Sequence, residues 1–220
     1  MSLVERSVKL PVSYRYTLEL PSVPAPLLLC LHGYGQTVAD ALHFGRLLAL
    51  DWPIAALQAP HPHHQTVSGK IVGAGFGWVS SFGPEEDIEN HHAFLRHVIQ
   101  ELFDEGVTSE PRAFLFGFSQ SVSLNYRFAA AYPDYVRGVV AVAGAAPSDW
   151  SASAPEPNLP MPVLHVAPSA DPAYPPSKTA TFKRQLQARC TDLTWHEEPG
   201  GHRVPSAAYG VVRDWLERKA

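Results

Sequence analysis

A serine stands between an apolar run and a helical pattern near the middle of the chain. Ser119 lies in Gly-Phe-Ser-Gln-Ser, residues 117–121, after the apolar run 113–116 and before the helical segment 122–131. A strand that turns sharply into a helix exposes a serine hydroxyl at its tip, and small residues on either side let the helix pass close to the strand. The pattern therefore predicts a serine nucleophile for acyl transfer. A serine that only caps the helix is the alternative.

A histidine and an aspartate follow the serine in the chain order of a serine triad on a strand-helix fold. Asp171 lies on a proline-bounded turn five residues after the apolar run 162–166, and His202 lies in Pro-Gly-Gly-His before the last helical pattern. Neutral imidazole can accept the serine proton near pH 7, and a carboxylate on its other nitrogen fixes its tautomer. Asp149 and Asp192 are rival acids, although Asp192 starts a strand and so lies at the wrong end. Asp171 and His202 as ordinary turn and loop residues are the alternative.

Backbone N–H groups for a developing oxyanion are expected at two places. The apolar run 27–31 ends in His-Gly-Tyr-Gly, residues 32–35. Glycines at such a turn let the backbone approach a substrate closely, and N–H groups fixed there can donate to an oxyanion. We expect the amides of Tyr34 and Gln120 to be the donors. A plain strand-to-helix turn, with His32 as a structural histidine, is the alternative.

Aromatic residues and histidines gather around a glycine-rich stretch in the first half of the chain. Phe76, Trp78 and Phe82 suit a substrate-binding wall around an acyl group, with ordinary packing as the alternative. The histidines of residues 61–64 and the pair 91–92 invite a metal site, but neither a Cys-x-x-Cys nor a His-Glu-x-x-His pattern is present. We therefore predict no metal and no cofactor, and place the pair on the exposed or half-exposed side of its helix.

The elements that must position these side chains alternate along the chain. Short apolar runs bounded by Gly, Pro or polar residues are typical of strands buried on both faces. The apolar runs are 27–31, 54–57, 113–118, 136–142 and 162–166, and the helical patterns are 38–50, 85–106, 120–131, 178–188 and 206–218. One or two edge strands are expected over 7–20, and irregular loops over 59–77 and 145–161. The alternation predicts an α/β fold with a mostly parallel central sheet flanked by helices on both faces, and ligands beyond the carboxyl ends of the strands.

Length and composition bound the remaining possibilities. The 220 residues, 45% of them hydrophobic, suit one domain, which we expect to span 1–220. A net charge of −4 offers no basic surface for nucleic acid, and no run approaches 18 apolar residues, so no stable membrane insertion is expected. Two cysteines and the lack of an apolar leader favour a cytoplasmic location. No pattern encodes the oligomeric state, and a homodimer stays open.

Taken together, these motifs resemble the phospholipase/carboxylesterase family of α/β-hydrolases, which includes acyl-protein thioesterases and small bacterial carboxylesterases. Nearly the whole chain participates. The segments that carry the similarity are Leu-His-Gly-Tyr-Gly at 31–35, Gln-Ala-Pro at 58–60, Gly-Trp at 77–78, Gly-Phe-Ser-Gln at 117–120, Ala-Asp-Pro at 170–172, and Gly-His at 201–202 with Trp-Leu at 215–216. The resemblance implies an α/β-hydrolase fold, hydrolysis of carboxylic esters or thioesters, no metal or organic cofactor, and an open acyl groove over the sheet.

Three segments depart from the family pattern. The strand-turn-helix segment around Ser119, residues 117–121, is the nucleophile elbow, and Ser121 replaces its last glycine. Val-Ser at 79–80 replaces an aromatic-acid pair, and Val-Ala-Pro-Ser at 166–169 replaces His-Gly-Thr before the acid. We predict a serine hydrolase that forms an acyl-enzyme with a small-molecule ester or thioester. A non-catalytic binding protein on the same fold, and a hydrolase of peptides or lactones, are the alternatives.

Overall fold

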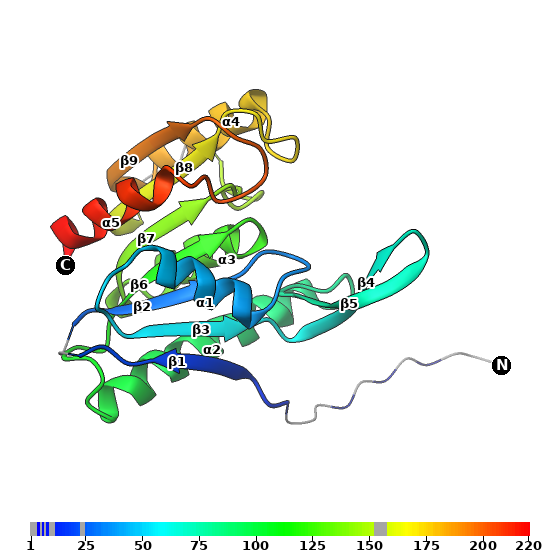
Figure 1. Ribbon diagram of the computed structural model, residues 1–220, viewed down its shortest axis with the longest axis horizontal. Helices are drawn as coiled ribbons and strands as arrows, with labels where there is room; N and C mark the ends of the chain where they lie inside the picture. The colour runs from blue at the N-terminus through cyan, green and yellow to red at the C-terminus, as the bar shows by residue number, and fades with distance from the viewer. Residues whose placement is uncertain (1–3, 5, 7, 9–11, 23–24, 152–157) are drawn as a thin grey trace.

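Strands and helices alternate around a seven-stranded sheet in the computed structural model, which describes residues 4, 6, 8, 12–22, 25–151 and 158–220 (Figure 1). The strands are β1 (Arg15–Glu19), β2 (Leu27–Leu31), β3 (Ile54–Gln58), β4 (His61–Val67), β5 (Lys70–Gly77), β6 (Ala113–Phe118), β7 (Val136–Val142), β8 (Leu159–Pro168) and β9 (Cys190–Glu198). The helices are α1 (Val38–Leu47), α2 (Pro84–Asp104), α3 (Gln120–Ala131), α4 (Pro176–Gln187) and α5 (Ala208–Lys219), with a short 3₁₀ turn at Pro133–Tyr135. No described helix combines the length and the apolar character needed to span a membrane.

The order of the strands creates one place where the chain reverses its direction across the sheet. The order is β1-β3-β2-β6-β7-β8-β9, and every neighbouring pair is parallel except β1 with β3. From β2 the chain moves outward to β3, whereas from β6 it moves the other way to β9. Ligands of open α/β sheets bind beyond the carboxyl ends of the strands at such a reversal. Here that place lies between β2 and β6, where Leu31 pairs with Gly117.

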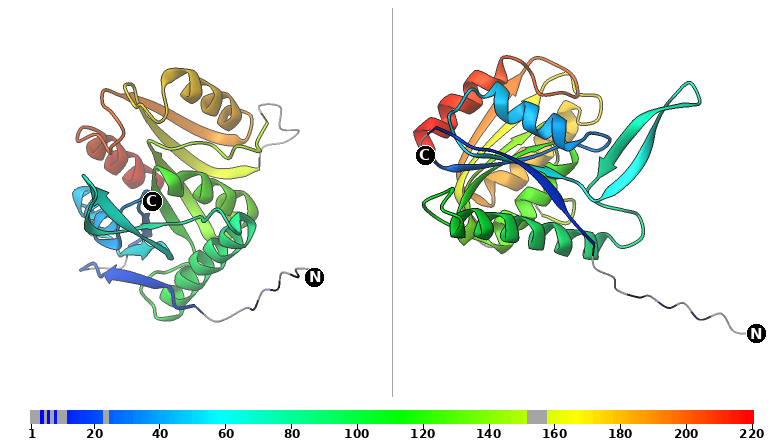
Figure 2. Two further views of the ribbon diagram at one scale, coloured as in Figure 1. Left: turned by 90° about the vertical axis from the view of Figure 1, so that its right-hand side faces the viewer. Right: turned by 60° about the horizontal axis from the view of Figure 1, so that its bottom comes forward.

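Both faces of this sheet are covered by helices, which explains the continuous apolar runs. Helices α1 and α5 lie on one face, and α2, α3 and α4 lie on the other (Figure 2). Leu28 and Cys30 face the first pair of helices, whereas Leu27, Leu29 and Leu31 face the other three. Side chains on both faces of a strand must then be apolar. The predicted α/β-hydrolase architecture is confirmed, and the predicted strands and helices agree to within a few residues.

The stretch 59–77, expected to be irregular, forms an antiparallel hairpin of β4 and β5. It extends away from the body of the molecule at the right of Figure 1. Its two-residue turn has positive φ at Ser68 and Gly69, 49° and 75°, as the turn that matches strand twist requires. The expectation of a loop was wrong because histidine, proline and glycine are poor predictors of strands, and backbone pairing overrides that preference.

Two further expectations fall partly outside the described residues. Residues 7 and 9–11 of the predicted edge-strand region lie outside them, and the rest contains one strand, β1. Residues 152–157 of the predicted loop 145–161 also lie outside them. That loop ends earlier than expected, because Leu159–Met161 belongs to β8 and Leu159 pairs with Cys190 of β9.

Candidate active site

Ser119 occupies the tip of the turn between β6 and α3 in a strained backbone conformation. Its φ is 57° and its ψ is −113°, a region that residues other than glycine rarely adopt. A hydrogen bond to the neighbouring strand maintains this conformation, because the Ser119 N–H donates to the Val142 carbonyl at 3.0 Å. The crossing is also tight, because a Cβ on Gly117 would lie 2.7 Å from Asn125 Nδ2. The backbone therefore presents the Ser119 hydroxyl beyond the carboxyl end of the sheet.

Ser121, which stands in the place of the elbow's last glycine, is fully buried and its hydroxyl is occupied by the backbone. Its Oγ accepts a hydrogen bond from the Phe118 N–H at 3.1 Å, and lies 3.1 Å from the Leu31 carbonyl, to which it can donate. A hydroxyl at this position thus ties the elbow to the neighbouring strand β2. It faces the interior and not the site.

His202 lies between Ser119 and Asp171. Its Nε2 is 2.9 Å from Ser119 Oγ, and its Nδ1 is 2.8 Å from Asp171 Oδ2. The Asp171 carboxylate has no exposed surface, whereas the His202 ring is 30% exposed. A buried carboxylate beside Nδ1 assigns the ring proton to that nitrogen, which leaves Nε2 free to accept the serine proton.

The Asp171 carboxylate is fixed by the turn that follows it. Its Oδ1 accepts hydrogen bonds from the N–H groups of Ala173 at 2.8 Å and Tyr174 at 3.2 Å. These bonds leave Oδ2 to face His202. The Tyr174 ring also packs on the His202 ring, with centroids 5.6 Å apart. Tyr174 escaped the sequence analysis, and its place three residues after Asp171 in a proline-bounded turn was the available signal.

Neither rival acid approaches His202. Asp192 lies near the start of β9 and pairs with Lys219 at 2.6 Å. Asp149 forms an ion pair with Arg127 on α3. Of the three aspartates considered, Asp171 alone contacts the imidazole.

The two expected oxyanion donors lie on adjacent strand ends. Tyr34 follows β2 and Gln120 begins α3 after β6, and these two strands are hydrogen-bonded neighbours. Among the described residues, neither N–H donates to a backbone carbonyl. Gly33 makes the approach close, because a Cβ there would lie 3.1 Å from Ser119 Cβ. The start of the Tyr34 loop therefore lies against Ser119, and neither N–H group is committed to a backbone carbonyl of the described residues.

The base of the β4–β5 hairpin holds this loop, which the sequence analysis did not foresee. The Gly35 N–H donates to the Phe76 carbonyl at 2.9 Å, and the Phe76 N–H donates to the Gln36 carbonyl at 3.0 Å. The rings of Tyr34 and His63 stack with centroids 4.4 Å apart and planes within 8°. An isolated antiparallel β-bridge between Gln36 and Phe76 therefore joins the loop 34–36 to the hairpin.

A second contact joins the hairpin to the start of α3. The Trp78 N–H, directly after β5, donates to Gln120 Oε1 at 2.9 Å. Gln120 is thus both a candidate oxyanion donor through its backbone and a support for the hairpin through its side chain.

The buried His32 side chain stabilises the start of the same loop. Its ring is buried, with Nε2 accepting the Ala59 N–H at 3.1 Å and Nδ1 lying 2.8 Å from the Gly33 carbonyl. These partners assign the ring proton to Nδ1. Burial lowers the pKa of His32 below its ordinary value, although the hydrogen bond to Gly33 opposes this, so the ring is neutral at pH 7. His32 joins the ends of β2 and β3.

The three aromatic residues expected to form a wall do not share one. Trp78 is only 1% exposed, and its Nε1 donates to the His32 carbonyl at 2.8 Å, so the ring belongs to the core. Phe82 is 99% exposed. Phe76 is half-buried on β5 at the hairpin base. Because the chain turns between these positions, their closeness in the sequence does not bring the rings together.

The histidine-rich segments are divided among separate contacts. His61 Nε2 lies 2.8 Å from Asp87 Oδ1, and the other Asp87 oxygen accepts the N–H and the hydroxyl of Ser80. Burial raises the pKa of Asp87, but the Ser80 hydrogen bonds and the neighbouring His61 outweigh it and hold the pKa below its usual value. Over the described ranges, no group of three or more His, Cys, Asp or Glu side chains is placed to hold a metal ion.

His91 corrects the expectation of an exposed or half-exposed pair on α2. It is 2% exposed, and its ring meets Trp78 edge to face with centroids 5.4 Å apart. His92 is half-buried, as expected. Burial, with a smaller effect of His92, lowers the pKa of His91 to about 3, so it serves as an apolar side chain. Histidine in a helix does not reveal by itself which face it takes.

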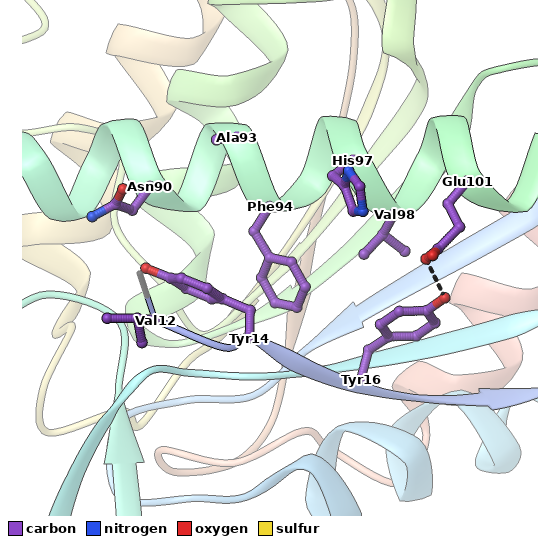
Figure 3. Close-up of a pocket in the computed structure, with 9 residues that line it drawn as sticks. All are labelled: Val12, Tyr14, Tyr16, Asn90, Ala93, Phe94, His97, Val98 and Glu101. Atoms are coloured by element: carbon purple, nitrogen blue, oxygen red, sulfur yellow. Dashed lines mark hydrogen bonds between the residues drawn. The ribbon is translucent and has the colours of Figure 1, made fainter. Parts of the chain in front are cut away.

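A cavity of about 490 Å³ lies away from these residues, between β1 and α2 (Figure 3). Its lining includes Tyr14, Phe94 and Val98, and the Tyr16 hydroxyl donates to Glu101 at 2.6 Å along one side. None of Ser119, His202 and Asp171 lines it. Volume alone therefore does not mark the reactive centre.

Comparison with known proteins bears on the family and the fold. The sequence profile of the family described as Phospholipase/Carboxylesterase matches residues 21–219. "Putative esterase NocK" of Nocardia uniformis subsp. tsuyamanensis is 31% identical over 161 residues, which cover 70% of this chain and 43% of that protein. The chain thus spans less than half the length of this relative.

Solved carboxylesterases share the fold. The carboxylesterase of Mesorhizobium loti superimposes with a TM-score of 0.73 at 20% identity, covering 93% of this chain and 94% of its own. The Bacillus cereus carboxylesterase gives a TM-score of 0.72 at 17% identity, covering 94% and 95%. At these identities the similarity concerns the fold alone.

Proposed function

Because the chain belongs to the phospholipase/carboxylesterase family, we propose that it cleaves carboxylic esters or thioesters with Ser119, His202 and Asp171 as a catalytic triad. The observation that carries the proposal is the chain of hydrogen bonds from the Ser119 hydroxyl through His202 to the buried Asp171 carboxylate. A nucleophile, a base and a group that orients the base are the parts that acyl transfer needs.

In the acylation step Ser119 Oγ attacks the carbonyl carbon of the substrate and its proton passes to His202 Nε2. The Asp171 carboxylate stabilises the imidazolium that forms. The carbonyl oxygen becomes an oxyanion, which accepts hydrogen bonds from the N–H groups of Tyr34 and Gln120. Removing one such donor from a serine hydrolase costs about 100- to 1000-fold in kcat.

The tetrahedral intermediate then collapses and expels the alcohol or thiol. His202 gives its proton to the departing oxygen or sulfur, and the acyl group stays on Ser119 as an ester. Water attacks that ester with the same proton transfers in reverse, which releases the carboxylic acid and restores the Ser119 hydroxyl. No redox step or cofactor enters this scheme.

The proposal is tested by labelling and by turnover. A fluorophosphonate should form an adduct on Ser119, mapped by mass spectrometry of the peptide spanning residues 117–123. Ser119→Ala and His202→Ala should each lower kcat on a p-nitrophenyl ester by about a thousandfold or more without lowering Tm substantially. An adduct on Ser121 or Ser123, or retained turnover in Ser119→Ala, would contradict the proposed triad.

A panel with a shared acyl group tests the bond that is cleaved. We expect hydrolysis of an oxygen ester and of the matching thioester, and much slower hydrolysis of the matching anilide, because an amine is a poorer leaving group. A lactone tests the remaining alternative. Labelling of Ser119 without hydrolysis of any ester or thioester would contradict the proposed activity.

A further inference from the structure

A recess of about 380 Å³ opens beside His202, within the range of small-molecule sites. It lies between α1, the start of α5 and the loop that carries His202. Its apolar wall consists of Phe44, Leu47, Phe118, Val204 and Tyr209. Phe118 directly precedes Ser119, and its ring centroid lies 5.3 Å from that of His202. The recess therefore borders His202 directly and reaches Ser119 only through its neighbour Phe118.

If the proposed function holds, the proton transfer from His202 indicates which part of the substrate lies in this recess. His202 must deliver its proton to the leaving oxygen or sulfur, so the leaving group has to lie within reach of its Nε2. The recess is lined by His202 itself. A leaving group that receives the proton from His202 therefore extends most directly into this space.

The recess is lined by one arginine and, within the described ranges, by no acidic residue. Arg203, the residue after His202, lines it together with the polar side chains of Gln36, His43 and Ser206. No aspartate or glutamate is among the lining residues. In the described parts of the chain no ion pair includes Arg203, whereas Arg46 pairs with Glu19.

We infer that this recess binds the leaving group of the substrate and that Arg203 recognises an anionic oxygen group, a carboxylate or a phosphate, on it. A guanidinium presents paired N–H donors that match these groups. The apolar wall suits the hydrocarbon part that joins the anion to the scissile bond. The substrate class that follows is an ester or thioester whose alcohol or thiol carries a negative charge.

The test compares acetate esters that differ only in the leaving group. Phenyl acetate is neutral, 3-carboxyphenyl acetate carries a carboxylate, and the acetyl ester of 3-hydroxyphenyl phosphate carries a phosphate. All three give the same acetyl-enzyme, so differences in kcat/KM report acylation and the recognition of the leaving group. The two charged esters distinguish the two anionic groups.

Arg203→Gln should lower kcat/KM for an anionic ester by about three- to tenfold, because the contact is charge-assisted but partly exposed. Hydrolysis of phenyl acetate should stay within about twofold. Arg184→Gln on α4, which removes the same charge outside the recess, is the matched control. Added salt should lower the preference of the wild type for the anionic ester and leave that of Arg203→Gln unchanged.

A second variant places the opposite charge in the same recess. Leu47 is 43% exposed on its rim, so Leu47→Glu can fold and should selectively slow the anionic esters. Equal losses on neutral and anionic esters in Arg203→Gln, or no loss on either anionic ester, would overturn the assignment of the recess. If wild-type protein hydrolyses phenyl acetate through Ser119 but shows no charge preference, the recess proposal alone fails. If it hydrolyses none of the esters, the proposed function fails.

Discussion

The two sides of the candidate site are supported in different ways. Ser119, Asp171 and His202 follow β6, β8 and β9, which are held by continuous parallel pairing from β6 to β9. Tyr34 follows the central strand β2, but its loop is also held to a hairpin outside the main sheet by two backbone hydrogen bonds, a hydrogen bond from the Gln65 side chain to the Gly35 carbonyl and one ring stack. The triad side therefore depends on the whole sheet, whereas the Tyr34 side depends on a few local contacts.

This difference predicts different responses to mutation. Substitutions on the triad side should remove chemistry and leave the fold, because the sheet positions the backbone without help from those side chains. Substitutions in the hairpin should shift the Tyr34 N–H and leave the contact between Ser119 and His202.

Asp171→Asn should give the largest loss, on the order of a thousandfold or more in kcat on a p-nitrophenyl ester, with KM less affected. Because two backbone N–H groups donate to the Oδ1 position, the amide oxygen should stay there and the NH2 group should face His202 and donate to Nδ1. The ring proton then lies on Nε2, so the wrong imidazole tautomer faces Ser119. Asp149→Asn, which removes the exposed partner of Arg127, is the control and should keep its turnover. If Asp149→Asn or Asp192→Asn were the damaging change, Asp171 would not be the acid of the triad.

Gly75→Ala tests the hairpin side. A Cβ at Gly75 would lie 2.5 Å from the Gly35 carbonyl oxygen, so the loop 34–36 must move. Because that loop carries the Tyr34 N–H, we expect a loss of about 10- to 100-fold in kcat/KM with a small change in Tm. Gly83→Ala, outside the hairpin, is the matched control and should leave kcat/KM nearly unchanged, because a Cβ there would meet nothing closer than 3.9 Å. Equal activities of the two variants would show that the hairpin does not position the loop.

The sequence predicted the triad side more completely than the hairpin side. Buried parallel strands give continuous apolar runs, and their order along the chain places Ser119, Asp171 and His202 near one edge. The hairpin has no such run, and its attachment to the loop 34–36 depends on contacts such as the stack of His63 on Tyr34. Sequence periodicity does not encode contacts of this kind.

The burial of individual side chains was also harder to predict than the strand, helix or loop on which they lie. Trp78 and Phe82 are four residues apart, yet one is in the core and the other is almost fully exposed. His91 was expected to have at least partial exposure, but it packs under Trp78. In each case tertiary packing decides the outcome, and the residue type permits both.

Ser121→Ala tests the boundary between the two sides, where the Ser121 hydroxyl links the elbow to β2. Removal of the hydroxyl leaves the buried Phe118 N–H without that acceptor. We therefore expect the free energy of unfolding, measured in urea, to fall by about 1–3 kcal/mol. Turnover should change by less than about fivefold, since the hydroxyl faces the interior. Ser123→Ala, on the half-buried side of α3, is the matched control. A loss of turnover as large as that of Ser119→Ala, with unchanged stability, would give Ser121 a chemical role.

The last effect is on stability alone and concerns the buried His91 of α2, which packs against Trp78 at the hairpin base. Both ring nitrogens of His91 are buried without a hydrogen-bond partner among the described residues. Its pKa is about 3 in the folded protein, against about 6.5 for an ordinary histidine. Between these values the unfolded chain binds a proton that the folded protein does not bind. The free energy of unfolding should therefore fall as the pH falls below about 6.5.

His91→Leu removes this proton linkage without removing a hydrogen bond. The wild type should lose about 2 kcal/mol through His91 between pH 7.5 and pH 5, because one such group contributes about 1.4 kcal/mol per pH unit below 6.5. The variant should therefore gain stability relative to the wild type at pH 5 but not at pH 7.5, as measured by urea unfolding at both pH values. His64→Leu, on the exposed part of β4, should show the pH dependence of the wild type. Burial also lowers the pKa of His92 and His165, so His91→Leu should lose only part of the acid sensitivity of the wild type. If His91→Leu kept the full dependence of the wild type, His91 would not contribute to it.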